Sequence, residues 1–174
     1  MTGPPTYLDT NPLMRWVESI GDESDTYSRR IGDRLLEVFE ATDDLAVSEM
    51  TLIEFYNNVC KYWRQNEPDK RVFDRAWALG SFDQLMSRIH DGTIRVLPPN
   101  ARSFRLALTW VTAATREHGR AFQVSDGIHL AEATAWARHL GTKVRLITSD
   151  PDFGSLFEVF PEFATLVELA DLAE

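Results

Sequence analysis

The sequence predicts a single α/β domain, in which a mainly parallel central sheet of about five strands is flanked by helices on both faces. Two observations support this fold class. Short apolar strand patterns alternate with longer helical patterns along the 174 residues. The composition, 44% apolar and 26% charged, is sufficient for one buried core and excludes a disordered chain. We therefore expect one domain over residues 1–174, with a loose tail at residues 1–5.

The expected elements follow from periodicity and from residues that start or stop helices. Strands are expected at residues 6–9, 45–47, 93–97, 143–148 and 163–169. Helices are expected over residues 27–41, 71–90 and 102–117, with a break at 66–69 and further helices that open at Asn11-Pro12, Ser48 and Ser125. Gly141 is expected to end the helix that Ser125 caps. The helix after Ser48 has the expected buried stripe Leu52, Phe55, Tyr56, Val59 and Trp63.

The charge and cysteine content narrow the class of protein. The net charge of -9 argues against sequence-independent nucleic-acid binding, which relies on lysine and arginine, although basic residues gather locally at 29–34 and 61–75. No apolar run approaches the roughly 18 residues of a membrane-spanning helix, and the N-terminus has no signal-peptide pattern. The single cysteine, Cys60, excludes an internal disulfide and a cysteine-based zinc site. We expect a cytoplasmic protein without a membrane partner.

Four acids occupy the positions where an α/β fold collects its ligands. Asp9 and Asp150 follow predicted strands, Glu54 lies early in the helix after the second strand, and Asp126 lies at a helix N-terminus. Each acid alone could be a helix cap or a turn residue. Together they predict one acidic pocket at the carboxyl edge of the sheet. Carboxylates brought this close repel one another, and a hard divalent cation such as Mg²⁺ or Mn²⁺ removes that repulsion.

The segments around these acids resemble the motifs of a known family. Leu8-Asp9-Thr10-Asn11 is similar to the first motif of PIN-domain nucleases of the VapC type, the toxins of VapBC toxin–antitoxin pairs. Residues 48–55, 126–133 and 148–153 are similar to the second, third and fourth motifs, in the order of the family. The resemblance spans almost the whole chain. The chain is longer than a typical toxin of this group, chiefly in the helical regions 18–44 and 64–92.

The resemblance implies a PIN-like three-layer fold and a metal-dependent endoribonuclease that cleaves RNA phosphodiester bonds. Asp9, Glu54, Asp126 and Asp150 would be catalytic. Asp9, Asp126 and Asp150 would hold Mg²⁺ or Mn²⁺, while Glu54 would bind the ion or orient the attacking water. Four polar neighbours would hydrogen-bond these groups, namely Thr10, Asn11, Thr148 and Ser149. The implied partners are single-stranded or loop RNA, a cognate antitoxin that blocks the pocket, and a second copy of the chain.

Several alternatives stay open at this stage. A PIN-like RNA-binding scaffold without catalysis would be indicated by the loss of an acid, and none is lost. A phosphatase of the haloacid-dehalogenase type needs a second aspartate two residues after the first, where this chain has Asn11. Asp152 could be a fifth acid of the pocket, but the motif match favours Asp150, and we expect Asp152 to cap the short helix that starts at Phe153. His129 is either a metal ligand or a packed, hydrogen-bonded imidazole.

Overall fold

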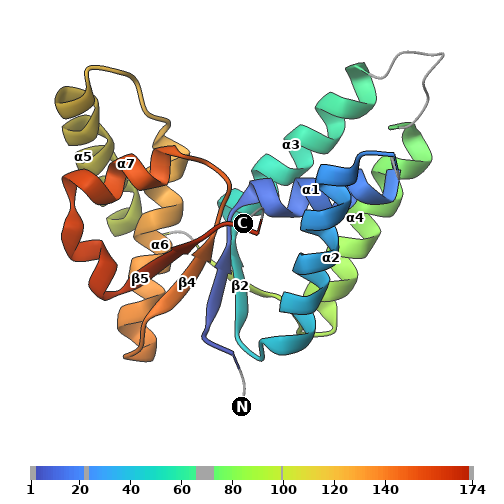
Figure 1. The fold of residues 1–174 in the computed structure, drawn as a ribbon, viewed down its shortest axis with the longest axis horizontal. Helices are drawn as coiled ribbons and strands as arrows, with labels where there is room; N and C mark the ends of the chain where they lie inside the picture. Colours follow the sequence, from blue (N-terminus) through green and yellow to red (C-terminus); the bar gives the residue numbers. More distant parts are fainter. Residues whose placement is uncertain (1–2, 22–23, 66–72, 99, 173–174) are drawn as a thin grey trace.

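The computed structural model describes residues 3–21, 24–65, 73–98 and 100–172 and shows a five-stranded sheet (Figure 1). The strands lie in the order β3-β2-β1-β4-β5, and every neighbouring pair is parallel. The predicted parallel sheet is therefore confirmed. The strands are β1 (Thr6–Leu8), β2 (Leu45–Ser48), β3 (Arg95–Leu97), β4 (Val144–Ile147) and β5 (Val167–Ala170).

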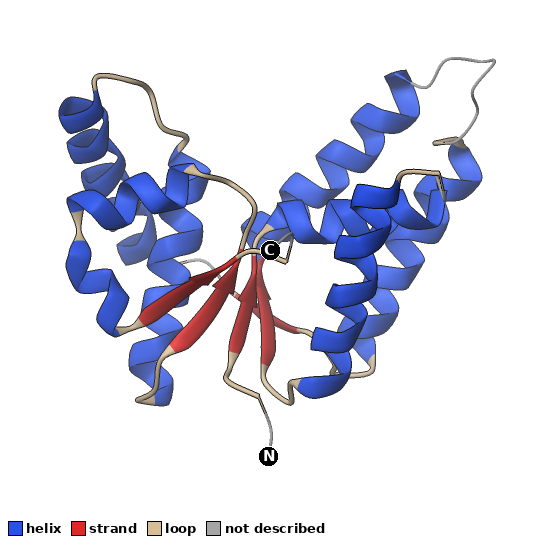
Figure 2. Ribbon diagram, in the orientation of Figure 1, coloured by secondary structure: helices blue, strands red, loops and turns tan. Residues whose placement is uncertain are grey.

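Helices cover both faces of this sheet, as Figures 1 and 2 show. The helices α1–α4 lie on one side and α5–α7 on the other. They are α1 (Thr10–Gly21), α2 (Thr26–Ala41), α3 (Glu49–Gln65), α4 (Arg75–His90), α5 (Ala101–His118), α6 (Val124–Leu140) and α7 (Asp152–Val159), followed by a short 3₁₀ helix (Pro161–Thr165). The 3₁₀ helix takes up residues expected in the last strand, so β5 begins at Val167 and not at Phe163.

The alternation of side chains along the strands divides the core into two layers. Tyr7 packs with side chains of α5, α6 and α7, whereas the next residue, Leu8, packs with side chains of α1 to α4. Both side chains are fully buried. The molecule is thus a three-layer α/β/α arrangement with the sheet in the middle, because each face of the sheet needs its own apolar cover.

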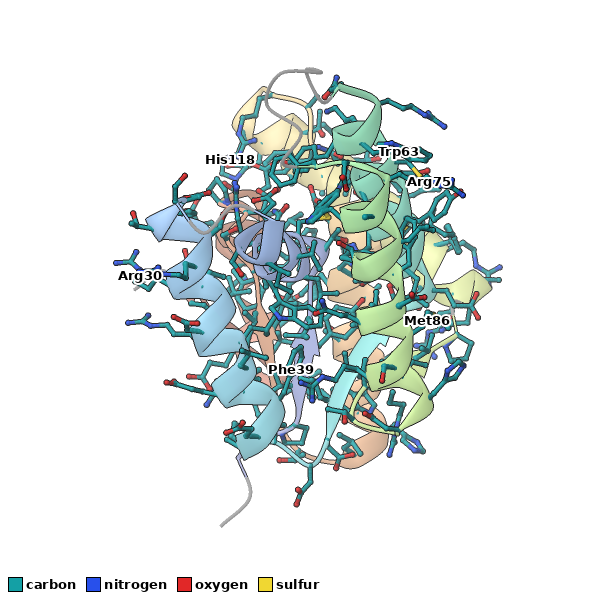
Figure 3. All side chains as sticks on the ribbon, turned by 90° about the vertical axis from the view of Figure 1, so that its right-hand side faces the viewer. Arg30, Phe39, Trp63, Arg75, Met86 and His118 are labelled. Carbon is teal, nitrogen blue, oxygen red and sulfur yellow. The ribbon has the colours of Figure 1, made fainter. Side chains whose placement is uncertain are left out.

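The buried stripe of α3 differs from the one expected. Tyr56 and Trp63 were predicted to be buried, but they are 56% and 42% exposed, and Figure 3 labels Trp63. The buried residues are Thr51, Phe55 and Val59, each four positions after the last, together with Cys60. The prediction was wrong because the elements that contact α3, chiefly α1 and α4 together with β2 and α6, cover a narrower side of it than the apolar pattern suggests. Tyr56 instead stacks on Phe82 of α4, with ring centroids 5.1 Å apart.

Two helix boundaries near the acids bear on the predictions. Gly141 ends α6 in the left-handed conformation, at φ 67°, as expected. Ser125 was predicted to cap α6, but the helix begins at Val124 and its cap position is Gln123. The predicted break at 66–69 and the start of the predicted helix at 71 fall outside the described residues. Among the residues described, no helix is long and apolar enough to cross a membrane.

Candidate active site

The four predicted acids meet in one cavity at the carboxyl edge of the sheet. Backbone pairing continues one residue past β1, where the N–H of Asp9 donates to the carbonyl of Ile147 at 3.1 Å. The starts of α3, α6 and the loop after β4 come together around this point. The cavity has a volume of about 270 Å³. It is lined by Asp9, Thr10, Asn11, Glu54, Asn57, Asn58, Gln123, Ser125, Asp126 and Asp150.

Asp9 is held rigidly at the base of the cavity. One carboxylate oxygen, Oδ1, accepts from the backbone N–H of Thr10 at 2.6 Å, and Oδ2 accepts from the hydroxyl of Thr148 at 2.8 Å. Burial raises the pKa of Asp9, although nearby His129 and these hydrogen bonds act in the opposite direction. The backbone N–H of Thr10 and the hydroxyl of Thr148 thus hold the two oxygens of this carboxylate.

Glu54 reaches the same cavity from the first turns of α3. Its Oε2 accepts from the Thr10 hydroxyl at 2.6 Å and lies 3.1 Å from Nε2 of His129. Burial by itself would raise the pKa of Glu54, but the hydrogen bonds from His129 and Thr10 outweigh it, and the pKa is lowered. Glu54 is thus ionised at neutral pH.

Asp126 lies in the first turn of α6 and is buried. Its pKa is raised to about 7, first by burial and then by the charges of Asp150 and Asp9. Its Oδ2 is buried without a hydrogen-bond partner among the residues that the structure describes. A buried carboxylate oxygen without a donor, facing two other carboxylates, is the environment that a hard cation would stabilise. The acids therefore fit a divalent metal ion.

Asp150 and its neighbours form the rim after β4. The N–H of Asp150 donates to the Thr148 hydroxyl at 3.0 Å, and its Oδ1 accepts from the N–H of Asp152 at 2.8 Å. The side chain of Asp150, rather than that of Asp152, thus accepts a hydrogen bond from the first backbone N–H of α7. The expected capping role of Asp152 is wrong, because its carboxylate forms an ion pair with Arg120 at 2.6 Å. Ser149 lines a neighbouring hollow instead of the acid cavity.

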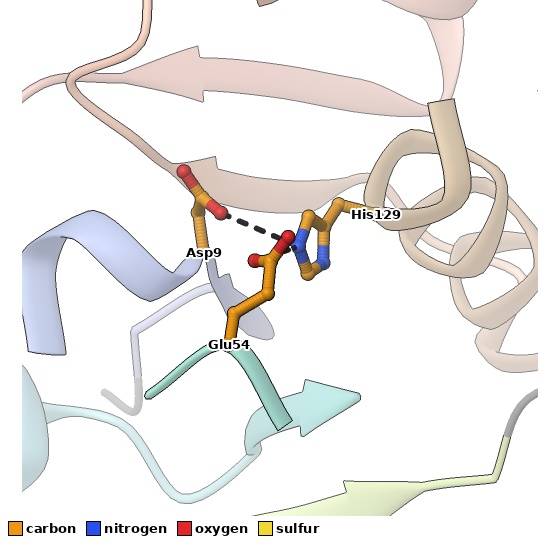
Figure 4. Close-up of side chains that lie close together, drawn as sticks. All are labelled: Asp9, Glu54 and His129. Carbon is orange, nitrogen blue, oxygen red and sulfur yellow. Dashed lines mark hydrogen bonds and ion pairs between the residues drawn. The ribbon is translucent and has the colours of Figure 1, made fainter. Parts of the chain in front are cut away.

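His129 lies behind the acids on α6 and is 1% exposed. Its Nε2 faces Glu54 and also lies 3.5 Å from Oδ1 of Asp9 (Figure 4). The ligand atoms of these three residues lie within 4.8 Å of one another. On the other side of the ring, Nδ1 lies 3.0 Å from the hydroxyl of Tyr7, which also donates to Glu132 at 3.4 Å.

Tyr7 and Glu132 are residues that sequence reasoning missed. The only available signal was that Glu132 follows His129 by three positions on a largely apolar helix, which places both on one side of it. Tyr7 on β1 contacts both residues, and this contact could not be predicted before the position of the strand beside α6 was known.

Comparison with known proteins identifies the fold. No protein-family model and no curated protein matches the sequence. Among solved structures, a chain of the FitAB complex bound to an IR36 DNA fragment has a TM-score of 0.59 at 19% identity, over 97% of this chain and 96% of that one. DNA-bound VapBC from Salmonella typhimurium has a TM-score of 0.56 at 14% identity, over 98% and 99% of the two chains.

A third similar structure is VapC20 from Mycobacterium tuberculosis, described as a toxin that cleaves the sarcin-ricin loop. It has a TM-score of 0.55 at 18% identity and covers 86% of this chain and 93% of that chain. At these identities the likeness establishes the fold. The chain has the PIN-like three-layer α/β fold of the VapBC and FitAB structures, which confirms the predicted fold class.

Proposed function

We propose that this protein is a metal-dependent endoribonuclease and the toxin of a toxin–antitoxin pair. The observation that carries the proposal is the convergence of Asp9, Glu54, Asp126 and Asp150 on one cavity of a PIN-like fold. A similar fold belongs to VapC20, described as a toxin that cleaves the sarcin-ricin loop. A scaffold without catalysis would have no need to keep four carboxylates together, because their repulsion destabilises the metal-free protein.

Asp9, Asp126 and Asp150 would hold the Mg²⁺ or Mn²⁺ ion. All three offer carboxylate oxygens, which are the ligands that both ions prefer. When bound, the ion would polarise the scissile phosphate and lower the pKa of a water molecule. The hydroxyl of Thr148 and the N–H of Thr10 keep the Asp9 carboxylate oriented toward this position.

Glu54 would act on the attacking water. Its lowered pKa keeps the carboxylate ionised, so it can accept a hydrogen bond from that water and take up its proton. The hydroxyl of Thr10 holds Glu54 at the cavity.

The lining of the cavity suits a single strand of RNA. Besides the acids, it consists of neutral polar side chains, which can hydrogen-bond phosphate and ribose without adding negative charge. They are Thr10, Asn11, Asn57, Asn58, Gln123 and Ser125. Unpaired or loop RNA is the expected substrate class, because its flexible backbone can be drawn into a cavity of about 270 Å³.

The partners follow from the same likeness. The similar VapBC and FitAB structures are complexes with DNA fragments. With a net charge of -9 this chain is poorly suited to bind DNA itself, so a cognate antitoxin would supply that contact and cover the cavity. We also propose a homodimer located in the cytoplasm.

The proposal can be tested with the purified protein, freed from any antitoxin. We expect it to cleave unpaired or loop RNA with Mg²⁺ or Mn²⁺ and to lose this activity in EDTA. Asp126→Asn should abolish cleavage while the fold is kept, because it removes a ligand charge but almost no volume. Asp83→Asn, the same change at an exposed position of α4, is the matched control. Full metal-dependent cleavage by Asp126→Asn would contradict the assignment, and a panel of RNAs left intact with every metal would favour a binding scaffold.

A further inference from the structure

A buried imidazole that the proposed mechanism does not use lies behind the acids of the cavity, in contact with Glu54. His129 connects Glu54, at the cavity, with Tyr7 and Glu132, which lie in the interior. The exposed fractions of Tyr7, His129 and Glu132 are 0%, 1% and 3%. Such a buried polar chain is conformationally fixed when its members are paired, because each lost partner leaves a desolvated group.

We propose that His129 is a positioning residue for the reaction: its Nε2–H fixes the Glu54 carboxylate at the cavity, and Tyr7 with Glu132 holds the ring from behind. This inference rests on the proposed function, since it assigns the way in which that site keeps its water-activating group in place. His129 acts through Glu54 and does not itself touch the substrate.

The geometry at Glu54 supports this role. The glutamate side chain has three rotatable bonds and extends from α3, so an unanchored carboxylate would sample several rotamers. Two donors from other elements meet the same oxygen, Oε2: the Thr10 hydroxyl at 2.6 Å and Nε2 of His129 at 3.1 Å. Thr10 lies on α1 and His129 on α6. Glu54 is therefore fixed between helices on opposite sides of the sheet.

The geometry behind the ring explains why the imidazole stays in this orientation. Tyr7 lies on β1 and is fully buried, and its hydroxyl faces the ring. The hydroxyl lies 3.0 Å from Nδ1 of His129 and 3.4 Å from Oε2 of Glu132. The tyrosine therefore has a hydrogen-bond partner on each side. A ring held at Nδ1 by a strand residue has its Nε2 directed at Glu54.

The test compares variants that keep or remove the donor. His129→Leu should lower kcat roughly 10- to 100-fold with little change in KM, the usual effect of losing a group that orients an active-site residue. His129→Gln, whose amide can donate from nearly the same place as Nε2, should recover most of this loss. Tyr7→Phe should give a smaller decrease. His139→Gln, at an exposed position of the same helix, is the control for the chemical change.

A double-mutant cycle separates positioning from an independent role. In a Glu54→Gln background, His129→Leu should cause no further decrease in kcat beyond about twofold. A full additional decrease would overturn the proposal. Pulsed electron paramagnetic resonance of the Mn²⁺-loaded protein provides a second test, namely whether His129 binds the metal directly. A directly bound nitrogen would make His129 a metal ligand and would also overturn it.

A measurement independent of activity distinguishes this proposal from the proposed function. In ¹⁵N NMR of the metal-free protein, the Nε2–H of His129 should be slow to exchange, and its resonance should shift in Glu54→Gln but not in Asp83→Asn. An unprotonated Nε2, or an Nε2–H resonance that does not shift in Glu54→Gln, would contradict the proposed contact between His129 and Glu54. If the contact is present and no RNA is cleaved, it is the ribonuclease function that fails.

Discussion

At the scale of single residues, Asp126 should make the stability of the metal-free protein depend on pH. Its pKa is raised from the ordinary 3.8 to about 7, so between these values the folded state holds a proton that the unfolded state has lost. The stability contributed by this proton is present at low pH and is lost as pH rises through about 7. Because of this residue, the free energy of unfolding should fall by up to about 4 kcal/mol over the whole pH range, and by about 2–3 kcal/mol between pH 5 and pH 8. Urea unfolding in EDTA at pH 5 and pH 8 measures it.

The matched variant isolates Asp126 from its neighbours. Asp126→Asn should be no less stable than the wild type at pH 8 without metal, and its stability should depend less on pH. Some dependence of the same sign should remain, because burial also raises the pKa of Asp9. Asp83→Asn should retain the wild-type profile. An Asp126→Asn profile as steep as that of the wild type would show that Asp126 is not the group responsible.

At the scale of elements, the site depends on how closely α6 approaches α5. Gly127 follows Asp126, and a Cβ built on it would lie 2.8 Å from Cγ2 of Val111 and 3.0 Å from the carbonyl oxygen of Ala107. Gly127→Ala should therefore destabilise the fold by about 1–3 kcal/mol, because backbone atoms must shift. The shift displaces the first turn of α6, so metal affinity should fall as well.

A second glycine provides the comparison. Gly80 lies inside α4, and a Cβ built on it meets no atom within 4 Å. Gly80→Ala should stabilise the protein by about 0.5–1 kcal/mol, since alanine favours the helix. Urea unfolding of both variants, with calorimetric titration of Mn²⁺, tests the pair. Equal stability of Gly127→Ala and the wild type would contradict the close packing of α5 and α6.

The elements also show what could be predicted from sequence. Asp9 and Asp150 were placed correctly because a short apolar strand followed by an acid is a local pattern, and parallel strands end at a common edge. The start of α6 was missed by two residues, since Val124 and Ser125 are both compatible with a first turn. Asp152 was misassigned because its partner, Arg120, is distant in sequence. Tyr56 and Trp63 fit an apolar stripe, but tertiary packing decides how wide that stripe is.

At the scale of the whole molecule, the cavity joins two separate cores. Asp9 lies just before α1 and Glu54 lies on α3, and both helices pack on one face of the sheet. Asp126 belongs to α6, which packs on the other face. This juxtaposition follows from strand order, which sequence periodicity does not specify. It also explains why the contacts of His129 could not be foreseen: the ring on α6 meets Glu54 on α3 only across the sheet edge.

A metal ion shared between the two faces should stabilise the entire fold. An ion that binds only the native state raises the unfolding free energy by about 2.7 kcal/mol at 100 times its dissociation constant. For a chain of this size that corresponds to a rise in Tm of roughly 5–10 °C. Differential scanning calorimetry with and without millimolar Mn²⁺ measures the shift. Asp9→Asn should show a much smaller rise, because it removes one of the proposed ligand charges. The wild-type carboxylate is held at the cavity by the N–H of Thr10 and the hydroxyl of Thr148. Equal rises in both proteins would mean that the ion binds elsewhere, since a site that includes Asp9 cannot lose that charge without losing affinity.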